Sequence, residues 1–281
     1  MAATCTDVAV QGQPSLRLAL PGGDAVQVAL HGATVLSWVA SGRERLFLSR
    51  SSRFNGQDPI RGGIPVCWPQ FNARGPLPKH GFARNRPWLL DGPPVLQHAL
   101  AQATWRLPET PQTQALWPHP ADLRLTVRLT PGALRVTLGV DNRGDQPLAF
   151  TGALHTYLAV DDLAQAGVTG LGGQPEWDAL TDTHGTAADR LQVADGLDRV
   201  YAAAPHPLRL LDGPHALDVS QSPEWAQTVV WSPTAPQAAQ LPDLAPGEHR
   251  RMLCIEAAQV FHPVTVPPGG RWQGWQQLQT V

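Results

Sequence analysis

The amino-acid sequence predicts an all-β fold, a large antiparallel β-sandwich formed by one domain that spans residues 1–281. Apolar and polar residues alternate with a period of two in several segments, as in strands with one buried face. The chain also contains 28 prolines and 26 glycines, which would interrupt long helices. Helical periodicity is scarce, and only residues 185–204 could be interpreted as a helix.

The strongest strand signal lies between Leu123 and Val140. In the segment LRLTVRLT, leucine and valine alternate with arginine and threonine, and after Pro131-Gly132 the alternation resumes as ALRVTLGV. This pattern predicts a hairpin with one buried and one solvated face. Shorter segments with the same character are VQVAL near the N-terminus, PLRLL at Pro207–Leu211 and QTVVW further on.

The remaining composition limits the class of protein. We find no internal repeat, low-complexity tract or convincing linker, which favours a single domain. The three cysteines, Cys5, Cys67 and Cys254, are far apart and odd in number, which argues against a disulfide framework or a zinc knuckle. The N-terminus lacks the features of a signal peptide, and no apolar stretch is long enough to span a membrane. We therefore expect a soluble cytoplasmic protein without a membrane partner.

Positive charge is concentrated in one segment. The formal net charge is −2, yet residues 53–88 contain six arginines and lysines against Asp58 alone, a local charge of +5. Such a concentration is suited to binding an anion, and guanidinium groups suit a phosphate. A small phosphorylated molecule fits this cluster better than nucleic acid, because the rest of the chain is acidic and carries no basic-aromatic stripe.

This cationic segment also contains Lys79, the only lysine of the chain. Two interpretations of this residue stay open, since an arginine-rich composition could leave one lysine by chance and a ligand could require it. Eleven of the 32 residues from 56 to 87 are glycine or proline. We expect a rigid, irregular segment whose backbone can approach a ligand closely.

The segment QPLAFTGALHTYLAV places a histidine on an informative face. If residues 148–160 form a strand, large apolar side chains lie mainly on one face, while His155 lies on the other with Tyr157 and several small residues. The first face would pack in the core. The second could line a cavity with His155 on its floor, or His155 could be half-exposed on a solvated face.

The segment RMLCIEAAQV raises the same question for a carboxylate. Leu253 and Ile255 point to one side of the expected strand, whereas Met252, Cys254 and Glu256 point to the other. Glu256 could simply mark the point where the strand reaches water. Alternatively, it could lie against an apolar wall with its pKa raised towards neutrality and act as a base.

Several of these segments resemble one known family. The block IRGGIPVCWPQF followed by HGFARNRPW closely resembles the hexose-6-phosphate mutarotases, also called glucose-6-phosphate 1-epimerases, of the aldose 1-epimerase superfamily. The likeness spans nearly the whole chain and includes, in order, HGATVLSW, RLFLS, GALHTYLAV, LDRVY, VVWSP and MLCIEAA. It implies a galactose mutarotase-like super-sandwich and an enzyme that interconverts the α and β anomers of a hexose 6-phosphate, with glucose 6-phosphate as the expected substrate.

The resemblance also implies roles for individual residues. His155 and Glu256 fall on the family's catalytic histidine and glutamate. The implied substrate-binding residues are Arg61, Lys79, His80, Arg84 and Asp198. Lys79 stands where many relatives have glutamine, so its role is open between phosphate binding and recognition of a hydroxyl group. Trp68 stands where phenylalanine is usual.

We expect ionised Glu256 to act as the base and protonated His155 as the acid. The ten histidines show no spacing typical of metal ligands, and the reaction needs neither a metal nor a redox cofactor. The expected partner is a small hexose phosphate bound by a monomer. Alternatives are a mutarotase of unphosphorylated aldoses and a non-catalytic phosphosugar-binding protein. Trp68 or Trp88 could stack on the sugar or belong to the core.

Overall fold

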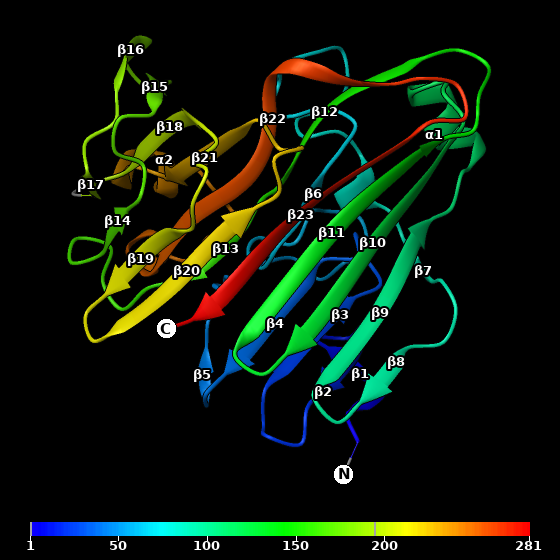
Figure 1. The fold of residues 1–281 in the computed structure, drawn as a ribbon, viewed down its shortest axis with the longest axis horizontal. Helices are drawn as coiled ribbons and strands as arrows, with labels where there is room; N and C mark the ends of the chain where they lie inside the picture. The colour runs from blue at the N-terminus through cyan, green and yellow to red at the C-terminus, as the bar shows by residue number, and fades with distance from the viewer. Residues whose placement is uncertain (1, 194) are drawn as a thin grey trace.

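The computed structural model describes residues 2–193 and 195–281, which form three antiparallel sheets with few helices (Figure 1). The first sheet is N-terminal and has the strand order of the sequence. Its strands are β1 (Thr4–Val10), β2 (Gln13–Ala19), β3 (Ala25–Ala29), β4 (Val35–Ala40) and β5 (Arg43–Glu44). These sheets confirm the prediction of an all-β antiparallel architecture.

The second sheet has ten strands, several of which run side by side across the front of Figure 1. Its order is β17 (Arg190–Gln192), β14 (Gly167–Thr169), β19 (Leu208–Asp212), β20 (His215–Gln221), β23 (Arg271–Thr280), β11 (Ala133–Asn142), β10 (Ala121–Thr130), β9 (Leu100–Leu107) and β7 (Leu89–Leu90), with β8 (Val95–Gln97) also paired to β9.

The third sheet has eight strands and carries the residues of the candidate site. Its order is β16 (Thr183–Thr186), β15 (Pro175–Asp178), β18 (Leu197–Ala202), β21 (Gln227–Ser232), β22 (Met252–Val266), β12 (Leu148–Leu154) and β6 (Val66–Cys67), with β13 (Tyr157–Ala159) also paired to β22.

Helices are short in the described part of the chain. They are α1 (Pro111–Leu116), α2 (Ala235–Ala239) and the 3-10 turns η1 (Ala83–Asn85) and η2 (Glu248–Arg251). Thr110 and Thr234 begin the two α-helices with capping boxes, each followed by a proline in the first turn. No helix among the described residues is both long and apolar enough to cross a membrane.

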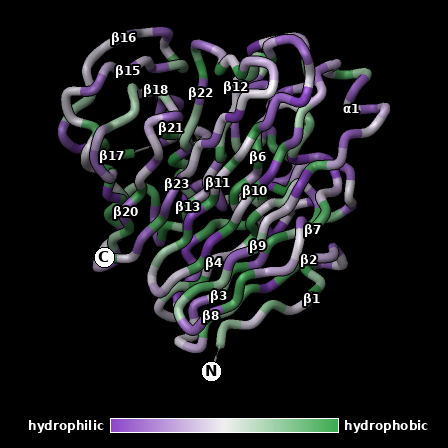
Figure 2. The backbone as a smooth tube through the Cα atoms, turned by 45° about the vertical axis from the view of Figure 1, so that its right-hand side comes forward, coloured by the Kyte–Doolittle hydropathy of each residue, from purple (hydrophilic) through white to green (hydrophobic). Residues whose placement is uncertain are grey.

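The predicted hairpin is confirmed as β10 and β11. Leu123 pairs with Val140 and Leu125 with Leu138, and all four side chains are buried. The turn is closed by Gly132, whose positive φ of 68° favours glycine. Hydrophobic and hydrophilic residues succeed one another along the strands, as Figure 2 shows, because one face packs inward and the other meets solvent.

The main core lies between the ten-stranded and eight-stranded sheets. One hydrophobic cluster contains Leu125 of β10 and Leu138 of β11 together with Phe150 of β12 and Ile255 of β22. Both tryptophans considered for sugar stacking belong to this core. Trp68 contacts Phe82, Trp117 and Phe150, and the buried Trp88 ring donates a hydrogen bond from Nε1 to the carbonyl of Ala83.

The helix considered for residues 185–204 is wrong. The described part of this segment contains the end of β16 and all of β17 and β18. Gly185 pairs with Glu176, and Val200 pairs with both Trp177 and Val229. Pairing on both sides of β18 satisfies the backbone and overrides the weak helical propensity of the segment.

Glu248 fixes the segment that follows α2 against the loop after β4 and β5. Its buried carboxylate accepts hydrogen bonds from the hydroxyl of Ser49, from the backbone N–H and Nε–H groups of Arg50, and from the N–H of Ala245. Burial opposes ionisation, but these hydrogen bonds outweigh it and lower the pKa of Glu248.

We predict that Glu248→Gln lowers the free energy of unfolding at pH 7 by about 1–3 kcal/mol, because the amide presents a donor to groups that are donors themselves. A carboxylate with a depressed pKa stabilises above its unfolded-state pKa, and this contribution is lost as the pH falls. The difference between wild type and variant should therefore shrink in acid. Urea unfolding at several pH values measures it, with the exposed Glu109→Gln as control. A difference that stays constant down to acidic pH would contradict this role.

Candidate active site

The structure brings all seven residues predicted for the site to the wall of one cavity of about 260 Å³. The acid/base candidates His155 and Glu256 and the five binding candidates come from β18, β22, the junction of β12 with β13, and the cationic segment. The other lining residues are Phe71, Asn72, Val229, Trp231 and Leu241. Residues separated by almost 200 positions in the sequence therefore share one small space.

Strand register places His155 directly opposite Glu256. Leu154 of β12 pairs with Ala257 of β22, and Tyr157 of β13 pairs with Cys254. The two pairs share one register, so His155 lies across from Glu256. Side chains directly opposite in antiparallel strands are close neighbours, and here Nδ1 of His155 lies 3.4 Å from Oε1 of Glu256.

The faces predicted for β22 are confirmed. Leu253 and Ile255 pack in the main core, whereas Met252 and Cys254 join a separate cluster on the opposite side. Glu256 is only 1% exposed and lies within β22, so the alternative that it marks a strand end in water is wrong. A half-exposed His155 is also wrong, since this residue is 6% exposed.

Burial shifts both members of the pair towards their neutral forms. Desolvation lowers the pKa of His155 well below its usual value, and the positive charges of Arg84 and Arg61 lower it further. Desolvation raises the pKa of Glu256 well above its usual value, and the negative charge of Asp198 adds to this. The two groups titrate as a pair, and a single proton can be held by either of them. Such a pair can donate a proton to one atom of a ligand and accept a proton from another atom.

Aromatic rings hold the imidazole of His155 in place. The ring of Tyr157 stacks on it with an interplanar angle of 8° and a centroid distance of 4.7 Å. Trp231 and His80 contact it edge-on, with centroid distances of 5.9 and 5.4 Å. These contacts restrict rotation of the imidazole, which keeps its nitrogens directed along fixed lines.

His80 is brought to the cavity by an unusual backbone conformation. Both His80 and Gly81 have positive φ values, 66° and 70°, and a Cβ at Gly81 would overlap the carbonyl of Trp68. Nδ1 of His80 accepts a hydrogen bond from the N–H of Asn72. Burial and the neighbouring cations keep the pKa of His80 well below its usual value. The neutral ring therefore carries its proton on Nε2, where it can serve as a donor.

The three cations of the cavity differ in their partners. Arg61 forms an ion pair with Asp243 at 3.1 Å and donates a hydrogen bond to the hydroxyl of Tyr157 at 3.0 Å. Arg84 donates to the backbone carbonyl of Lys79 at 3.1 Å. Among the described residues, no carboxylate lies within ion-pair distance of Lys79 or Arg84. These two cations are therefore the ones available to an anionic ligand.

Asp198 adds a carboxylate to the wall of the cavity. It lies in β18, where it pairs with Trp231 of β21. Burial is the main cause of its raised pKa, and the negative charge of Asp178 contributes. Its position in the lining makes it a hydrogen-bond acceptor for ligand hydroxyl groups.

Sequence reasoning missed Asp243 and Trp231 as parts of the site. Asp243 lies in an irregular segment with no local signal, and its role depends on contact with Arg61, far away in the sequence. Trp231 lies within a segment that resembles the family, but only the structure shows that it lines the cavity. The sequence did indicate the place of Tyr157, because the alternation of residues 148–160 puts its side chain on the same face as His155.

The other three arginines of the cationic segment lie outside the cavity lining. Arg53 forms an ion pair with Asp58. The guanidinium group of Arg74 lies over the rings of Trp177 and Phe261, at 4.9 and 5.4 Å from their centroids. Arg86 is partly buried next to η1 and does not line the cavity. None of these three arginines therefore contributes a guanidinium group to the wall of the cavity.

Three potential metal ligands lie close together next to the cavity, although sequence spacing does not suggest a metal site. His155, Cys254 and Glu256 each offer one ligand atom, and these atoms lie within 4.8 Å of one another. All three residues are buried. Cys254 and Glu256 are two positions apart on one face of β22, and His155 joins them across the sheet.

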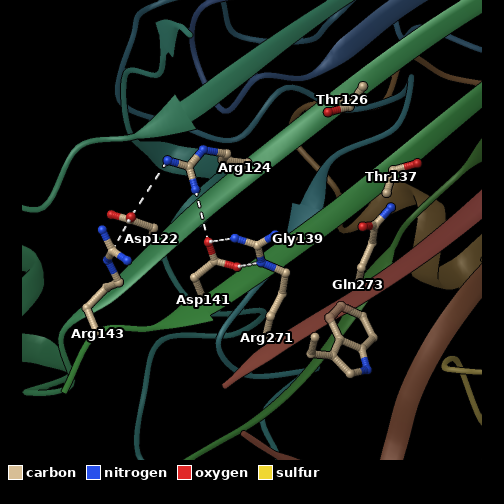
Figure 3. Close-up of a pocket in the computed structure, with 10 residues that line it drawn as sticks. Asp122, Arg124, Thr126, Thr137, Gly139, Asp141, Arg143, Arg271 and Gln273 are labelled. Atoms are coloured by element: carbon tan, nitrogen blue, oxygen red, sulfur yellow. Dashed lines mark hydrogen bonds and ion pairs between the residues drawn. The ribbon is translucent and has the colours of Figure 1, made fainter. Parts of the chain in front are cut away.

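A second hollow, of about 420 Å³, lies on the outer face of the ten-stranded sheet (Figure 3). Its charged groups are already paired with one another. Asp141 contacts both Arg124 and Arg271, and Asp122 contacts Arg143. The figure shows these side chains directed toward one another across β10, β11 and β23. The hollow therefore offers a ligand less uncompensated charge than the cavity at His155.

Comparison with known proteins agrees with this geometry. The family model described as aldose 1-epimerase matches residues 14–279, so the chain belongs to the aldose 1-epimerase family. The protein is an isomerase, and its substrate is a small sugar molecule.

Two relatives carry the name "Putative glucose-6-phosphate 1-epimerase". The one from Cenchrus ciliaris is 35% identical over 266 residues, covering 91% of this chain and 81% of the relative. The one from Escherichia coli (strain K12) is 33% identical over 241 residues, covering 82% and 78%.

Solved structures support the predicted fold. A crystal structure described as a putative mutarotase from Salmonella typhimurium has a TM-score of 0.90 and 26% identity, covering 99% of this chain and 93% of that one. Galactose 1-epimerase from Lactobacillus acidophilus NCFM has a TM-score of 0.74 at 14% identity, covering 99% of each chain, and shows the shared fold. The galactose mutarotase-like architecture is therefore confirmed.

We predict that Arg61 and Asp243 are energetically coupled, because most of their surface is removed from water. A double-mutant cycle with Arg61→Met and Asp243→Asn, followed by urea unfolding, should give a coupling energy of about 1–3 kcal/mol. The exposed pair Arg209–Asp218 provides a control cycle, in which about 1 kcal/mol or less is expected. Equal coupling in the two cycles would contradict the structural role of Asp243.

Proposed function

We propose that the protein interconverts the α and β anomers of a hexose 6-phosphate, with glucose 6-phosphate as substrate. One observation carries the proposal: the cavity combines a desolvated His155–Glu256 pair with two cations, Lys79 and Arg84, that form no ion pair with a described carboxylate. The names of the relatives support the same substrate. The pair supplies proton transfer, and the cations supply an anchor for a phosphate.

Anomer exchange requires cleavage of the bond between C1 and the ring oxygen, rotation about C1–C2, and closure onto the other face of the aldehyde. On opening, Glu256 removes the proton of the C1 hydroxyl while His155 donates a proton to the ring oxygen. On closure the roles reverse. A positioned acid or base typically contributes about 10²- to 10⁴-fold each.

The shared proton of the pair fits this cycle. Opening proceeds from the charged form of the pair, which arises from the favoured neutral form when the shared proton passes from Glu256 to His155. After opening, His155 is neutral and Glu256 is protonated. The two states contain the same number of protons, so no exchange with solvent is needed during the reaction. The raised pKa of Glu256 makes its carboxylate a stronger base, and the lowered pKa of His155 makes its imidazolium a stronger acid.

Different residues bind the two ends of the sugar phosphate, the 6-phosphate and the ring hydroxyl groups. Arg84 and Lys79 hold the 6-phosphate, while Arg61, with its charge balanced by Asp243, contributes hydrogen bonds beside them. Neutral His80 donates to a ring hydroxyl, and Asp198 accepts from another. An anchor at the 6-phosphate orients the sugar while leaving C1 free to rotate.

We also keep the predictions that the enzyme is a monomer, works in the cytoplasm and binds no nucleic acid.

We predict that His155→Ala and Glu256→Gln each lower kcat for anomer exchange of glucose 6-phosphate by about 10²- to 10⁴-fold. Exchange spectroscopy by NMR measures the rate, after subtraction of the spontaneous reaction. The exposed residues His206 and Glu224 provide the matched controls His206→Ala and Glu224→Gln. A wild-type rate in either active-site variant would refute the assignment. Binding of glucose 6-phosphate by the wild type without acceleration would favour the non-catalytic alternative.

We predict that Arg84→Ala raises the KM for glucose 6-phosphate by about 10- to 100-fold, because a charge-assisted hydrogen bond contributes about 1.5–3 kcal/mol. The KM for free glucose should change little. Arg128→Ala, on the solvated face of β10, is the matched control. An equal effect on the two sugars would remove Arg84 from phosphate binding. A wild type that prefers unphosphorylated sugar would favour the alternative mutarotase.

A further inference from the structure

The proposed reaction does not use the buried thiol of Cys254. This residue is fully buried and lies two positions before Glu256 on the same face of β22. Its sulfur, a ring nitrogen of His155 and a carboxylate oxygen of Glu256 lie within 4.8 Å of one another. The catalytic pair is thus accompanied by a soft donor atom that acid/base chemistry does not require.

This set of donors selects a particular kind of cation. Thiolate sulfur, imidazole nitrogen and carboxylate oxygen are the usual ligands of Zn²⁺, and Co²⁺ accepts the same set. Magnesium and calcium prefer oxygen ligands only and would not use the sulfur. Three protein ligands also leave a coordination position for a solvent molecule, as in open zinc sites.

The distances are close to those of a tetrahedral site. With metal–ligand bonds of about 2.0 Å for nitrogen and oxygen, two such ligands on a tetrahedron are separated by about 3.3 Å. Nδ1 of His155 and Oε1 of Glu256 lie 3.4 Å apart. With the longer metal–sulfur bond of about 2.3 Å, the sulfur of a tetrahedral site lies about 3.5 Å from the other ligand atoms. The sulfur of Cys254 lies within 4.8 Å of them, so it has to approach by about 1.3 Å at most.

Unsatisfied polar atoms point to the same site. Nδ1 of His155 and Oε2 of Glu256 are buried and have no hydrogen-bond partner in the described structure. A buried polar group without a partner is unfavourable, so a ligand that contacts both atoms is favoured. Thiolate and carboxylate together balance the two charges of the ion, so the neighbouring Arg61 and Arg84 face no net added charge.

We propose that a thiophilic divalent cation, Zn²⁺ or Co²⁺, binds to His155, Cys254 and Glu256 and inhibits the enzyme by occupying its acid and base. When the metal–sulfur bond forms, the thiol proton leaves; the proton shared by His155 and Glu256 leaves as well, so two protons pass to the buffer. No oxidation or reduction takes place. The inhibition rests on the proposed function, whereas the binding of the ion does not.

Binding is tested with Co²⁺ added to the reduced full-length protein under argon. We expect a thiolate-to-cobalt charge-transfer band in the near ultraviolet for the wild type and for Cys67→Ser, and its loss in Cys254→Ser. Cys67 is a matched control because it is also fully buried but does not belong to the donor cluster of His155, Cys254 and Glu256. Addition of Zn²⁺ should remove the band by displacing Co²⁺. A band that persists in Cys254→Ser, or that is absent from the wild type, would overturn the proposal.

Inhibition is tested by NMR anomer exchange with increasing Zn²⁺. We expect Cys254→Ser to need at least tenfold more Zn²⁺ for half inhibition than the wild type and Cys67→Ser, with Cys254→Ala as a second variant in case serine disturbs packing. Equal inhibition of all variants would overturn the proposed mode of inhibition. A Cys254-dependent cobalt band in a chain without isomerase activity would support the metal site and reject the proposed function, so the two failures are distinguishable.

Discussion

The candidate site depends on the register between β22 and the β12–β13 segment. Leu154 pairs with Ala257 and Tyr157 with Cys254, so His155 faces Glu256 across the sheet. Side chains alternate with a period of two, and a slip by one residue would turn Glu256 into the main core. The same alternation sends Ile255 into that core, which makes the slip costly. Packing of the apolar face thereby secures the positions of the polar pair.

The cationic segment follows a different rule, because apart from the short β6 it is held by backbone contacts outside regular strands. At Gly63 and Gly81 a Cβ would overlap a backbone carbonyl, so the chain can approach the sheets this closely only with glycine. This approach brings Arg61 and Arg84 to the cavity from one side. Asp243 then neutralises only one of them, and an asymmetric charge distribution results. A ligand with one anionic end matches this distribution.

Desolvation connects the proposed chemistry with the proposed sensitivity to metal ions. Burial lowers the pKa of His155 and raises the pKa of Glu256, and it also leaves Nδ1 and Oε2 without partners. A site prepared to bind a proton and a sugar oxygen is therefore also prepared to bind a metal ion. Cys254 makes this second possibility specific for thiophilic ions.

The sequence by itself determined the strand pattern, the faces of His155 and Glu256 and the local excess of positive charge. These features are local, since a period of two reports which side of a strand a residue occupies. Tertiary structure decided the fate of residues 185–204, where pairing with neighbouring strands overrode local propensity. It also decided the contact between Arg61 and Asp243 and the approach of Cys254 to His155. Such contacts join distant parts of the chain, and the strand register that creates them leaves no periodic signal in either partner.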